Sequence, residues 1–178
     1  MGTDTCALGP YRADLVEMYW RWEQDPALLV GYGRQQPVSL EARTEGIAHQ
    51  LRGDNIRFTV YDLATGAPVP AGVATLLPDS SVRTAEYVVM LAPEARGRGL
   101  GTSATRLVLD YAFHVTNLRM VWLKVLAPNK AAVRSYEKAG FRAAGALREA
   151  GYWLGTVCDE ILMDALASEF TGPSVITA

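Results

Sequence analysis

Hydrophobic and polar positions follow a helical rhythm in the first part of the chain and a strand-like rhythm after it. Apolar residues recur every three or four positions at first, and from position 56 they alternate with polar residues or form short apolar runs. The pattern predicts two helices and then three strands, over residues 13–23, 41–51, 56–62, 69–77 and 84–91. Glu86 is the charged residue of the third strand, which is otherwise almost wholly apolar.

The second half of the chain continues with alternating helices and strands. It predicts a helix over 100–115, a strand over 118–126, a short helix between Asn129 and Gly140, and a hairpin over 145–165. Asn129 suits a helix N-cap, and Gly140 suits the residue that ends a helix. The continuous apolar run over 118–126 is typical of a central strand covered on both faces. The resulting order, α-α-β-β-β-α-β-α-β-β, predicts an α/β fold with a mixed sheet flanked by helices.

Length and composition favour one globular domain. The chain has 178 residues, of which 49% are hydrophobic and 20% charged. We expect this domain over residues 1–170, followed by a flexible tail over 171–178. The formal net charge of −2 gives no basic surface for nucleic acid. No apolar run approaches the roughly 20 residues that cross a bilayer, and no signal peptide is recognisable, so we expect a cytoplasmic protein without membrane partners.

Cysteine and histidine usage argues against a metal site. Cys6 and Cys158 are far apart in the sequence, and we expect both thiols to stay reduced. Two scattered histidines without a cysteine pair do not match the ligand spacing of a zinc site, so no metal is expected.

A glycine-rich segment, Arg-Gly-Arg-Gly-Leu-Gly-Thr at 96–102, lies between the third strand and the long helix. Its glycines permit backbone conformations that other residues avoid, and the amides at the start of the helix attract an anion. With two arginines, the segment suits a diphosphate. A nucleotide P-loop is excluded because the segment lacks lysine. A dinucleotide fingerprint is excluded because its third glycine would fall on Thr102, and no carboxylate follows in 118–126.

Three separate motifs carry a family resemblance. Arg96, Gly99 and Gly101 fit the pattern Arg-x-x-Gly-x-Gly/Ala. The run over 129–141 contains Asn, Ala and then Tyr-Glu-Lys-Ala-Gly-Phe, and the run over 147–163 includes Leu-Arg-Glu, Tyr-Trp and Asp-Glu-Ile-Leu-Met. Together they resemble the GNAT family of acyl-CoA-dependent N-acetyltransferases. The last run resembles its RimJ/RimL-type branch, which includes spermidine and ribosomal-protein N-terminal acetyltransferases.

The resemblance implies a GNAT fold in which the third strand splays from its neighbour and acetyl-CoA lies between the two. The amides of the glycine-rich segment would hold the pyrophosphate, and the backbone of the third strand would bond to the pantetheine arm. A tight turn without a ligand and two solvated arginines are the alternatives for that segment. The candidate CoA-binding residues are Val88, Val89, Met90, Arg96, Gly97, Arg98, Gly99, Leu100, Gly101, Thr102, Asn129 and Ser135.

The resemblance also implies two catalytic residues, Glu86 and Tyr136. A carboxylate in an apolar strand is partly desolvated and becomes a better base near neutrality, so Glu86 would accept the proton of the amine. A structural salt bridge would explain Glu86 equally. Tyr136 follows Asn129 by two helical turns on nearly the same face, and it would protonate the departing CoA thiolate. Packing between helix and sheet is the alternative for Tyr136.

The acceptor side is less defined in the sequence. Aromatic residues with nearby carboxylates suit a cationic amine, and the candidate acceptor-binding residues are Trp22, Tyr32, Glu86 and Tyr152. Aromatic residues at helical spacing are equally typical of a core. We expect acetyl transfer to a primary amine of a small molecule, such as a polyamine, an amino sugar or an antibiotic, by direct attack in a ternary complex. The alternatives are a protein N-terminal acetyltransferase and a non-catalytic acyl-CoA sensor. The resemblance also favours a homodimer.

Overall fold

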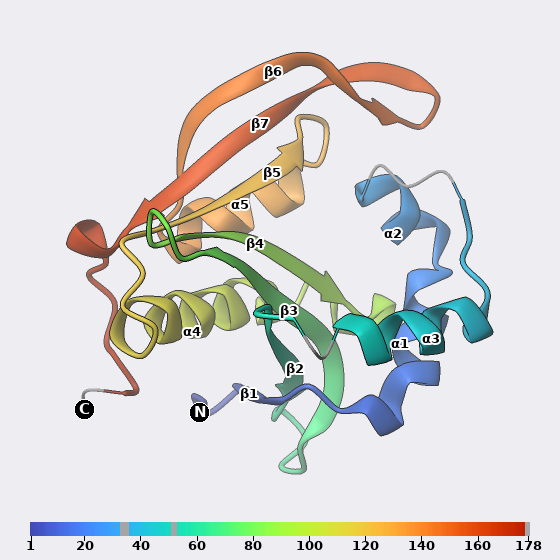
Figure 1. The fold of residues 1–178 in the computed structure, drawn as a ribbon, viewed down its shortest axis with the longest axis horizontal. Coiled ribbons are helices and arrows are strands. Elements are labelled where there is room, and N and C mark those ends of the chain that lie inside the picture. Colours follow the sequence, from blue (N-terminus) through green and yellow to red (C-terminus); the bar gives the residue numbers. More distant parts are fainter. Residues whose placement is uncertain (33–35, 51–52, 177–178) are drawn as a thin grey trace.

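The computed structural model describes residues 1–32, 36–50 and 53–176, and its centre is a twisted mixed sheet (Figure 1). The strand order across the sheet is β1-β2-β3-β4-β5-β7-β6. Neighbouring strands are antiparallel, apart from the parallel pair β4 and β5. The strands are β1 Cys6–Pro10, β2 Ile56–Asp62, β3 Val69–Asp79, β4 Thr84–Leu91, β5 Met120–Leu126, β6 Arg142–Trp153 and β7 Thr156–Leu166.

Helices cover both faces of the sheet. The described helices are α1 Val16–Glu23, α2 Pro26–Gly31, α3 Leu40–Gln50, α4 Leu100–His114 and α5 Lys130–Ala139, with short 3-10 turns at Ala13–Leu15, Pro93–Ala95 and Ala167–Glu169. Phe58 of β2 packs against Tyr111 of α4, with ring centroids 5.0 Å apart. The next residue, Thr59, bonds through its hydroxyl to the hydroxyl of Tyr19 in α1 at 2.7 Å. Because successive strand residues point to opposite faces, α1 and α4 lie on opposite sides of the sheet.

The structure confirms the predicted α/β architecture and adds two elements, β1 and α2. The first is an edge strand of five residues that ends in Gly9 and Pro10, too short to show a period. The second begins at Pro26, shortly after the predicted 13–23 helix. Asp25 is its N-cap, and the Asp25 side chain accepts a hydrogen bond from the amide of Ala27 at 3.3 Å. The final residue of the predicted 41–51 helix lies outside the described residues.

The predicted hairpin around Gly155 is confirmed as β6 and β7, which run somewhat longer than the predicted 145–165 range. Leu154 and Gly155 have φ angles of 50° and 82° at its tip. Two consecutive left-handed residues are typical of the tight turns whose twist matches a hairpin. In Figure 1 the two strands extend together past the end of β5.

The segment predicted as a flexible tail lies against α4 in its described part, 171–176. The hydroxyl of Ser174 donates to the carboxylate of Asp110 at 2.7 Å, and the amide of Val175 donates to the same group at 2.8 Å. Asp110 is buried and also bonds to Nδ1 of His114 at 2.7 Å. These contacts satisfy a carboxylate that would otherwise be costly to bury.

Within the described ranges, the longest and most apolar helices fall short of what is needed to cross a membrane.

Candidate active site

β4 and β5 form a fork, because they pair at their first residues and then diverge. Thr84–Glu86 of β4 pair with Met120–Trp122 of β5, whereas β4 continues to Leu91 and β5 to Leu126. Figure 1 shows the two strands separating beyond this point. A cleft of about 650 Å³ occupies the opening. The splayed strands expected from the sequence are therefore present.

The cleft brings together most of the candidate residues from three distant segments. β4 supplies one wall, the glycine-rich segment supplies the second and α5 supplies the third. Both candidate catalytic residues, Glu86 and Tyr136, line it. The candidate CoA-binding residues that line it are Val88, Val89, Met90, Arg96, Gly97, Gly99, Gly101, Thr102, Asn129 and Ser135.

The glycine-rich segment requires its glycines for backbone geometry and for space. Gly97 and Gly99 have φ angles of 72° and 82°, in the left-handed region that favours glycine. Gly99 is the N-cap of α4 and offers no capping side chain, so the first amides of this helix face the cleft without one. A Cβ on Gly101 would lie 3.3 Å from Leu91 and 3.4 Å from the Ser135 hydroxyl. The geometry suits an anion held by backbone amides.

α4 and α5 are joined beside the cleft by short polar side chains. The hydroxyls of Thr102 and Ser135 lie 2.9 Å apart. Asn129 caps α5, since its Oδ1 accepts from the amide of Ala132 at 3.2 Å, as predicted. The start of α4 is thereby joined to the middle of α5 beside the cleft.

The two arginines of the segment are held by protein carboxylates. Nη1 of Arg96 lies 2.5 Å from Asp25, and its other nitrogens donate to the carbonyl of Leu91 at 3.2 Å. Arg98 pairs with Asp62 at 2.8 Å and is absent from the cleft lining. Leu100, another candidate, is buried in the core, so its side chain is not available to a ligand. Sequence reasoning could not detect these partners, which lie far away along the chain.

Glu86 lies at the last paired position of the fork, opposite Trp122. Its side chain is 29% exposed, and its carboxylate lies 3.9 Å from Nζ of Lys124 on β5. This loose pair leaves the carboxylate open to the cleft, so both predicted roles, base and salt bridge, are compatible with the geometry. Lys124 was missed by the sequence analysis, because its place beside Glu86 depends on strand register.

Tyr136 reaches the cleft from α5 through a cluster of aromatic rings. Its ring centroid lies 6.4 Å from that of Tyr87 and 5.9 Å from that of Phe141. Burial raises the pKa of Tyr136 to about 12, so its hydroxyl keeps its proton at neutral pH. The Tyr87 hydroxyl lies 3.1 Å from that of Thr105, which donates to the carbonyl of Gly101 at 2.7 Å. This chain from β4 to the glycine-rich segment was also missed by the sequence analysis.

Positive charge predominates along the cleft. The charged residues that line it are Arg96, Lys124, Arg134 and Lys138 against Glu86 and Glu160. Such an excess suits a ligand that carries several phosphates. No cluster of three or more metal-ligating side chains is found among the described residues.

Comparison with known proteins agrees with this geometry. The family model described as an acetyltransferase (GNAT) domain matches residues 7–142. The chain belongs to the GNAT acetyltransferase family. It is 35% identical over 149 residues to the spermidine N(1)-acetyltransferase of Vibrio cholerae, a match that covers 82% of this chain and 84% of that enzyme.

Two further comparisons show how much of the chain resembles known acetyltransferases. The chain is 40% identical over 78 residues to the spermidine N(1)-acetyltransferase of Escherichia coli K12, and the match spans 42% of that enzyme's length. A crystal structure of spermidine N-acetyltransferase from Vibrio cholerae in complex with CoA and spermine superposes with a TM-score of 0.87. The superposition covers 96% of this chain and 100% of that one, at 24% identity. The fold is therefore the GNAT fold.

In this GNAT chain the candidate acceptor residues lie in different surroundings. Tyr32 lines the cleft, and its hydroxyl donates to the carbonyl of Val89. Trp22 is instead buried against Tyr19, with centroids 5.6 Å apart, and belongs to the core. Tyr152 is 53% exposed and lies outside the cleft lining, whereas the adjacent Trp153 lines it. Successive side chains of β6 point to opposite faces of the strand, so the cleft receives Trp153 rather than the predicted Tyr152.

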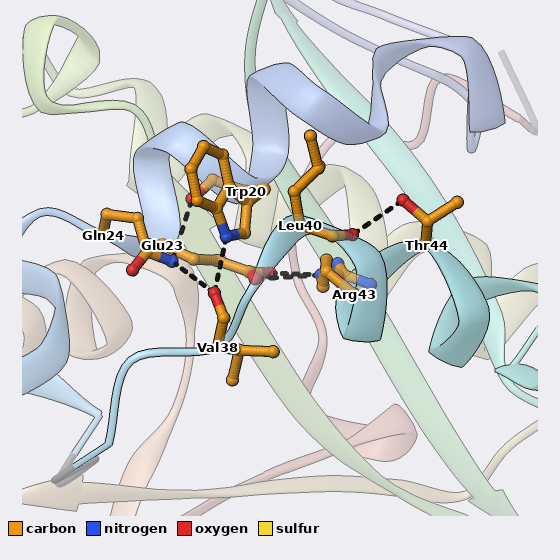
Figure 2. A network of polar contacts seen from close by, with 7 residues as sticks. All are labelled: Trp20, Glu23, Gln24, Val38, Leu40, Arg43 and Thr44. Atoms are coloured by element: carbon orange, nitrogen blue, oxygen red, sulfur yellow. Dashed lines mark hydrogen bonds and ion pairs between the residues drawn. The ribbon is translucent and has the colours of Figure 1, made fainter.

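A network of polar contacts connects α1 with α3 and with the segment that precedes α3 (Figure 2). Nε of Arg43 donates to both carboxylate oxygens of Glu23, at 3.1 and 2.9 Å. Nε1 of Trp20 donates to the carbonyl of Val38 at 2.6 Å, and the amide of Gln24 also reaches that carbonyl, at 3.4 Å. Several polar and aromatic residues of α1 thus serve to hold α3 in place.

Proposed function

We propose that this chain transfers the acetyl group of acetyl-CoA to a primary amine of a small molecule. The observation that carries the proposal is the fork between β4 and β5, where a glycine-rich anion cradle, Glu86 and Tyr136 share one cleft. The excess of positive charge along the cleft supports a polyphosphate donor such as CoA.

The donor would lie along the fork with its diphosphate at the glycine-rich segment. Backbone amides from 96 to 102 would hold the pyrophosphate, with Thr102, Asn129 and Ser135 beside it. The exposed backbone edge of Val88–Met90 would bond to the pantetheine amides, as an added strand would. The carbonyl of Val89 already accepts from Tyr32, and its second lone pair remains for the arm.

Two proton transfers would be needed at the fork. An alkyl ammonium with a pKa near 10.4 loses its proton at pH 7 at a cost of about 5 kcal/mol. Glu86 would accept that proton, directly or through water. The free amine nitrogen would then bond to the acetyl carbon as the carbon–sulfur bond breaks. Tyr136 would give its proton to the departing sulfur, so that an amide and a free thiol result.

Direct attack is favoured over an acetylated cysteine. Cys6 is buried in β1, and Cys158 belongs to β7, and neither lines the cleft. Burial raises the pKa of Cys6 to about 12, which keeps its thiol protonated and unreactive.

Polyamines are the first acceptors to test, because the two relatives reported above are named spermidine N(1)-acetyltransferases. Amino sugars and aminoglycoside antibiotics complete the small-molecule classes. The relatives do not favour a protein N-terminus or a non-catalytic sensor. We further propose the RimJ/RimL-type branch, supported by the run over 147–163, together with a homodimer, a cytoplasmic location and a single domain over 1–170.

A thiol-release assay tests the proposal. Acetyl-CoA would be incubated with the protein and with polyamines, amino sugars, aminoglycosides and N-terminal peptides in turn. We expect amine-dependent release of CoA thiol with at least one small amine, and its loss in Glu86→Gln. Tight CoA binding without release from any small amine would refute the enzymatic proposal, and release with peptides alone would identify a protein acetyltransferase.

A further inference from the structure

Carboxylates lie on both sides of Lys124, on the face of the sheet that carries Glu86. Trp122 of β5 pairs with Glu86 of β4, and Lys124 lies two residues further along β5, so it points to the same face. On its other side Lys124 pairs with Leu162 of β7, which makes Glu160 a diagonal neighbour. Diagonal neighbours are about 7–8 Å apart, within reach of a long side chain. Lys124 can therefore reach a carboxylate on each neighbouring strand.

Lys124 contacts one of these carboxylates and not the other. Its Nζ lies 3.9 Å from Glu86, and the two side chains are 41% and 29% exposed. Glu160 is half-buried and lines the same cleft as Glu86 and Lys124. Within the described part of the chain, the carboxylate of Glu160 has no ion pair and no hydrogen bond. Lys124 is thus held loosely at Glu86, with an unpaired carboxylate within reach.

The side chain of Lys124 and the proposed acceptor carry the same chemical group. Both end in a primary alkyl ammonium, and the acceptor must bring its own to Glu86, where Lys124 already lies. Two ammonium groups at one carboxylate repel each other, so the acceptor has to displace the lysine. A partly exposed ion pair with a long contact is weak, and its exchange costs little.

We propose that Lys124 is a positioning residue that pairs with Glu86 until the acceptor binds and then turns to Glu160. This inference rests on the proposed acetyl transfer at Glu86. Lys124 neutralises Glu86 in the free protein, and it neutralises Glu160 once the ammonium of the acceptor has taken its place. The apparent affinity for the acceptor is reduced by the fraction of protein in which Lys124 still occupies Glu86.

Amine kinetics at saturating acetyl-CoA test the exchange, with the best small amine of the thiol-release panel. Lys124→Met keeps much of the side-chain volume and removes the competing ammonium. We expect KM for the amine to fall about fivefold, with kcat changed by less than about twofold. Glu160→Gln should raise KM about threefold, because Lys124 loses its second partner and stays longer at Glu86.

A double variant separates the exchange from direct binding of the acceptor by Glu160. Once Lys124→Met has removed the lysine, adding Glu160→Gln should leave KM unchanged, because Glu160 acts through Lys124 alone. Glu160 is two strands away from Glu86, so its direct effect on an amine held there is largely screened at physiological salt. A KM that still rises in the double variant, or one that does not fall in Lys124→Met, would overturn the inference.

Asp164→Asn and Lys130→Met are the matched controls. Asp164 is the other diagonal neighbour of Lys124, but it lies opposite Arg142 of β6 and outside the cleft lining. Lys130 is an exposed lysine at the start of α5, and it does not line the cleft either. Both variants should keep the wild-type KM for the amine. A rise in Asp164→Asn equal to that in Glu160→Gln would contradict the exchange between the two cleft carboxylates.

Failure of the acetyl transfer itself would look different, since no amine would release thiol with any variant. Calorimetry with 1,4-diaminobutane on the CoA-loaded protein then measures amine binding without turnover. Binding that tightens in Lys124→Met and weakens in Glu160→Gln would support the exchange. Equal binding in all variants, or binding to none of them, would overturn it.

Discussion

Glu86 and Tyr136, the proposed base and acid, reach the cleft from opposite faces of the sheet. Glu86 points to the same face of the sheet as Val88, whereas the adjacent Tyr87 points toward α4 and packs against Tyr136. The fork between β4 and β5 joins the two faces. A base and an acid placed in this way would serve an amine that enters from one side and a thiolate that leaves toward the other.

Substitution of Tyr136 tests the acid. Tyr136→Phe keeps the ring contacts with Tyr87 and Phe141 and removes the proton donor. We expect turnover to fall at least tenfold, roughly the low end for acid catalysis, with little change in CoA affinity. Steady-state kinetics with CoA calorimetry measures both, and unchanged turnover would remove Tyr136 from the mechanism.

Cys6 gives a prediction on stability rather than activity. Burial, followed by the nearby charge of Asp62, raises the pKa of the folded thiol to about 12 from 9.0. Because the unfolded thiol loses its proton at lower pH, the stabilisation is complete below pH 9 and is lost as the pH rises toward 12. The free energy of unfolding of wild type relative to Cys6→Ala should drop by about 3 kcal/mol between pH 8 and pH 11.

Denaturant titrations of the two proteins at each pH measure this difference. The tyrosines with raised pKa values are present in both proteins, so their effects cancel in the comparison. A difference that stays constant with pH would show that the Cys6 thiol does not titrate as described.

At the scale of elements, the glycine-rich segment and the start of α4 make up the proposed anion cradle. Gly99 has a φ angle of 82°, and a Cβ there would meet open space. Gly66, in the turn between β2 and β3, has the same φ angle and is equally open. Comparing substitutions at these two glycines therefore distinguishes the cost of backbone strain from an effect on ligand binding.

Alanine at each position gives a matched pair. Gly99→Ala and Gly66→Ala should each lower the free energy of unfolding by about 1–2 kcal/mol, the cost of a side chain in the left-handed region. Gly99→Ala alone should also weaken CoA binding, by about tenfold, because a backbone that relaxes out of the left-handed region would move the amides of the proposed cradle. Equal CoA affinity in both variants would place the diphosphate elsewhere.

The elements differ in how far the sequence could predict them. The central strands and α4 follow from apolar periodicity, and α5 follows from its Asn129 cap and Gly140 end. β1 has five residues, and α2 has six and begins with proline, so neither is long enough to show a period. The Asp25–Pro26 pair is a helix-start signal, but an Asp-Pro pair also marks turns, so it does not by itself predict α2.

The residues of the candidate site also differ in how far the sequence could predict them. The glycine-rich segment and Tyr136 belong to local motifs, so their place in the cleft could be predicted. The acceptor side depends on pairs far apart in sequence, such as Tyr32 with Val89, or Arg43 with Glu23. Trp22 is an example: its helical spacing is compatible with a pocket and with the core, and only the structure shows that it packs against Tyr19 in the core.

At the scale of the whole molecule, the fold holds two clefts around one strand. β4 provides the open edge for the proposed donor and also lines a smaller cleft of about 360 Å³. Leu28 of α2 and the adjoining Tyr32 line both spaces. The ion pair of Asp25 with Arg96 and the hydrogen bond of Tyr32 to Val89 hold both ends of α2 to the donor side. Donor and acceptor would therefore meet at the fork without a separate domain.

A single-turnover reaction followed by mass spectrometry tests this account most directly. The protein would be mixed in excess with acetyl-CoA labelled in its acetyl group and with an accepted amine, and then quenched at successive times. We predict that the label passes from the thioester to the amine while the mass of the protein stays unchanged throughout. Label that appears first on the protein, or that never leaves bound acetyl-CoA, would contradict direct transfer at the fork.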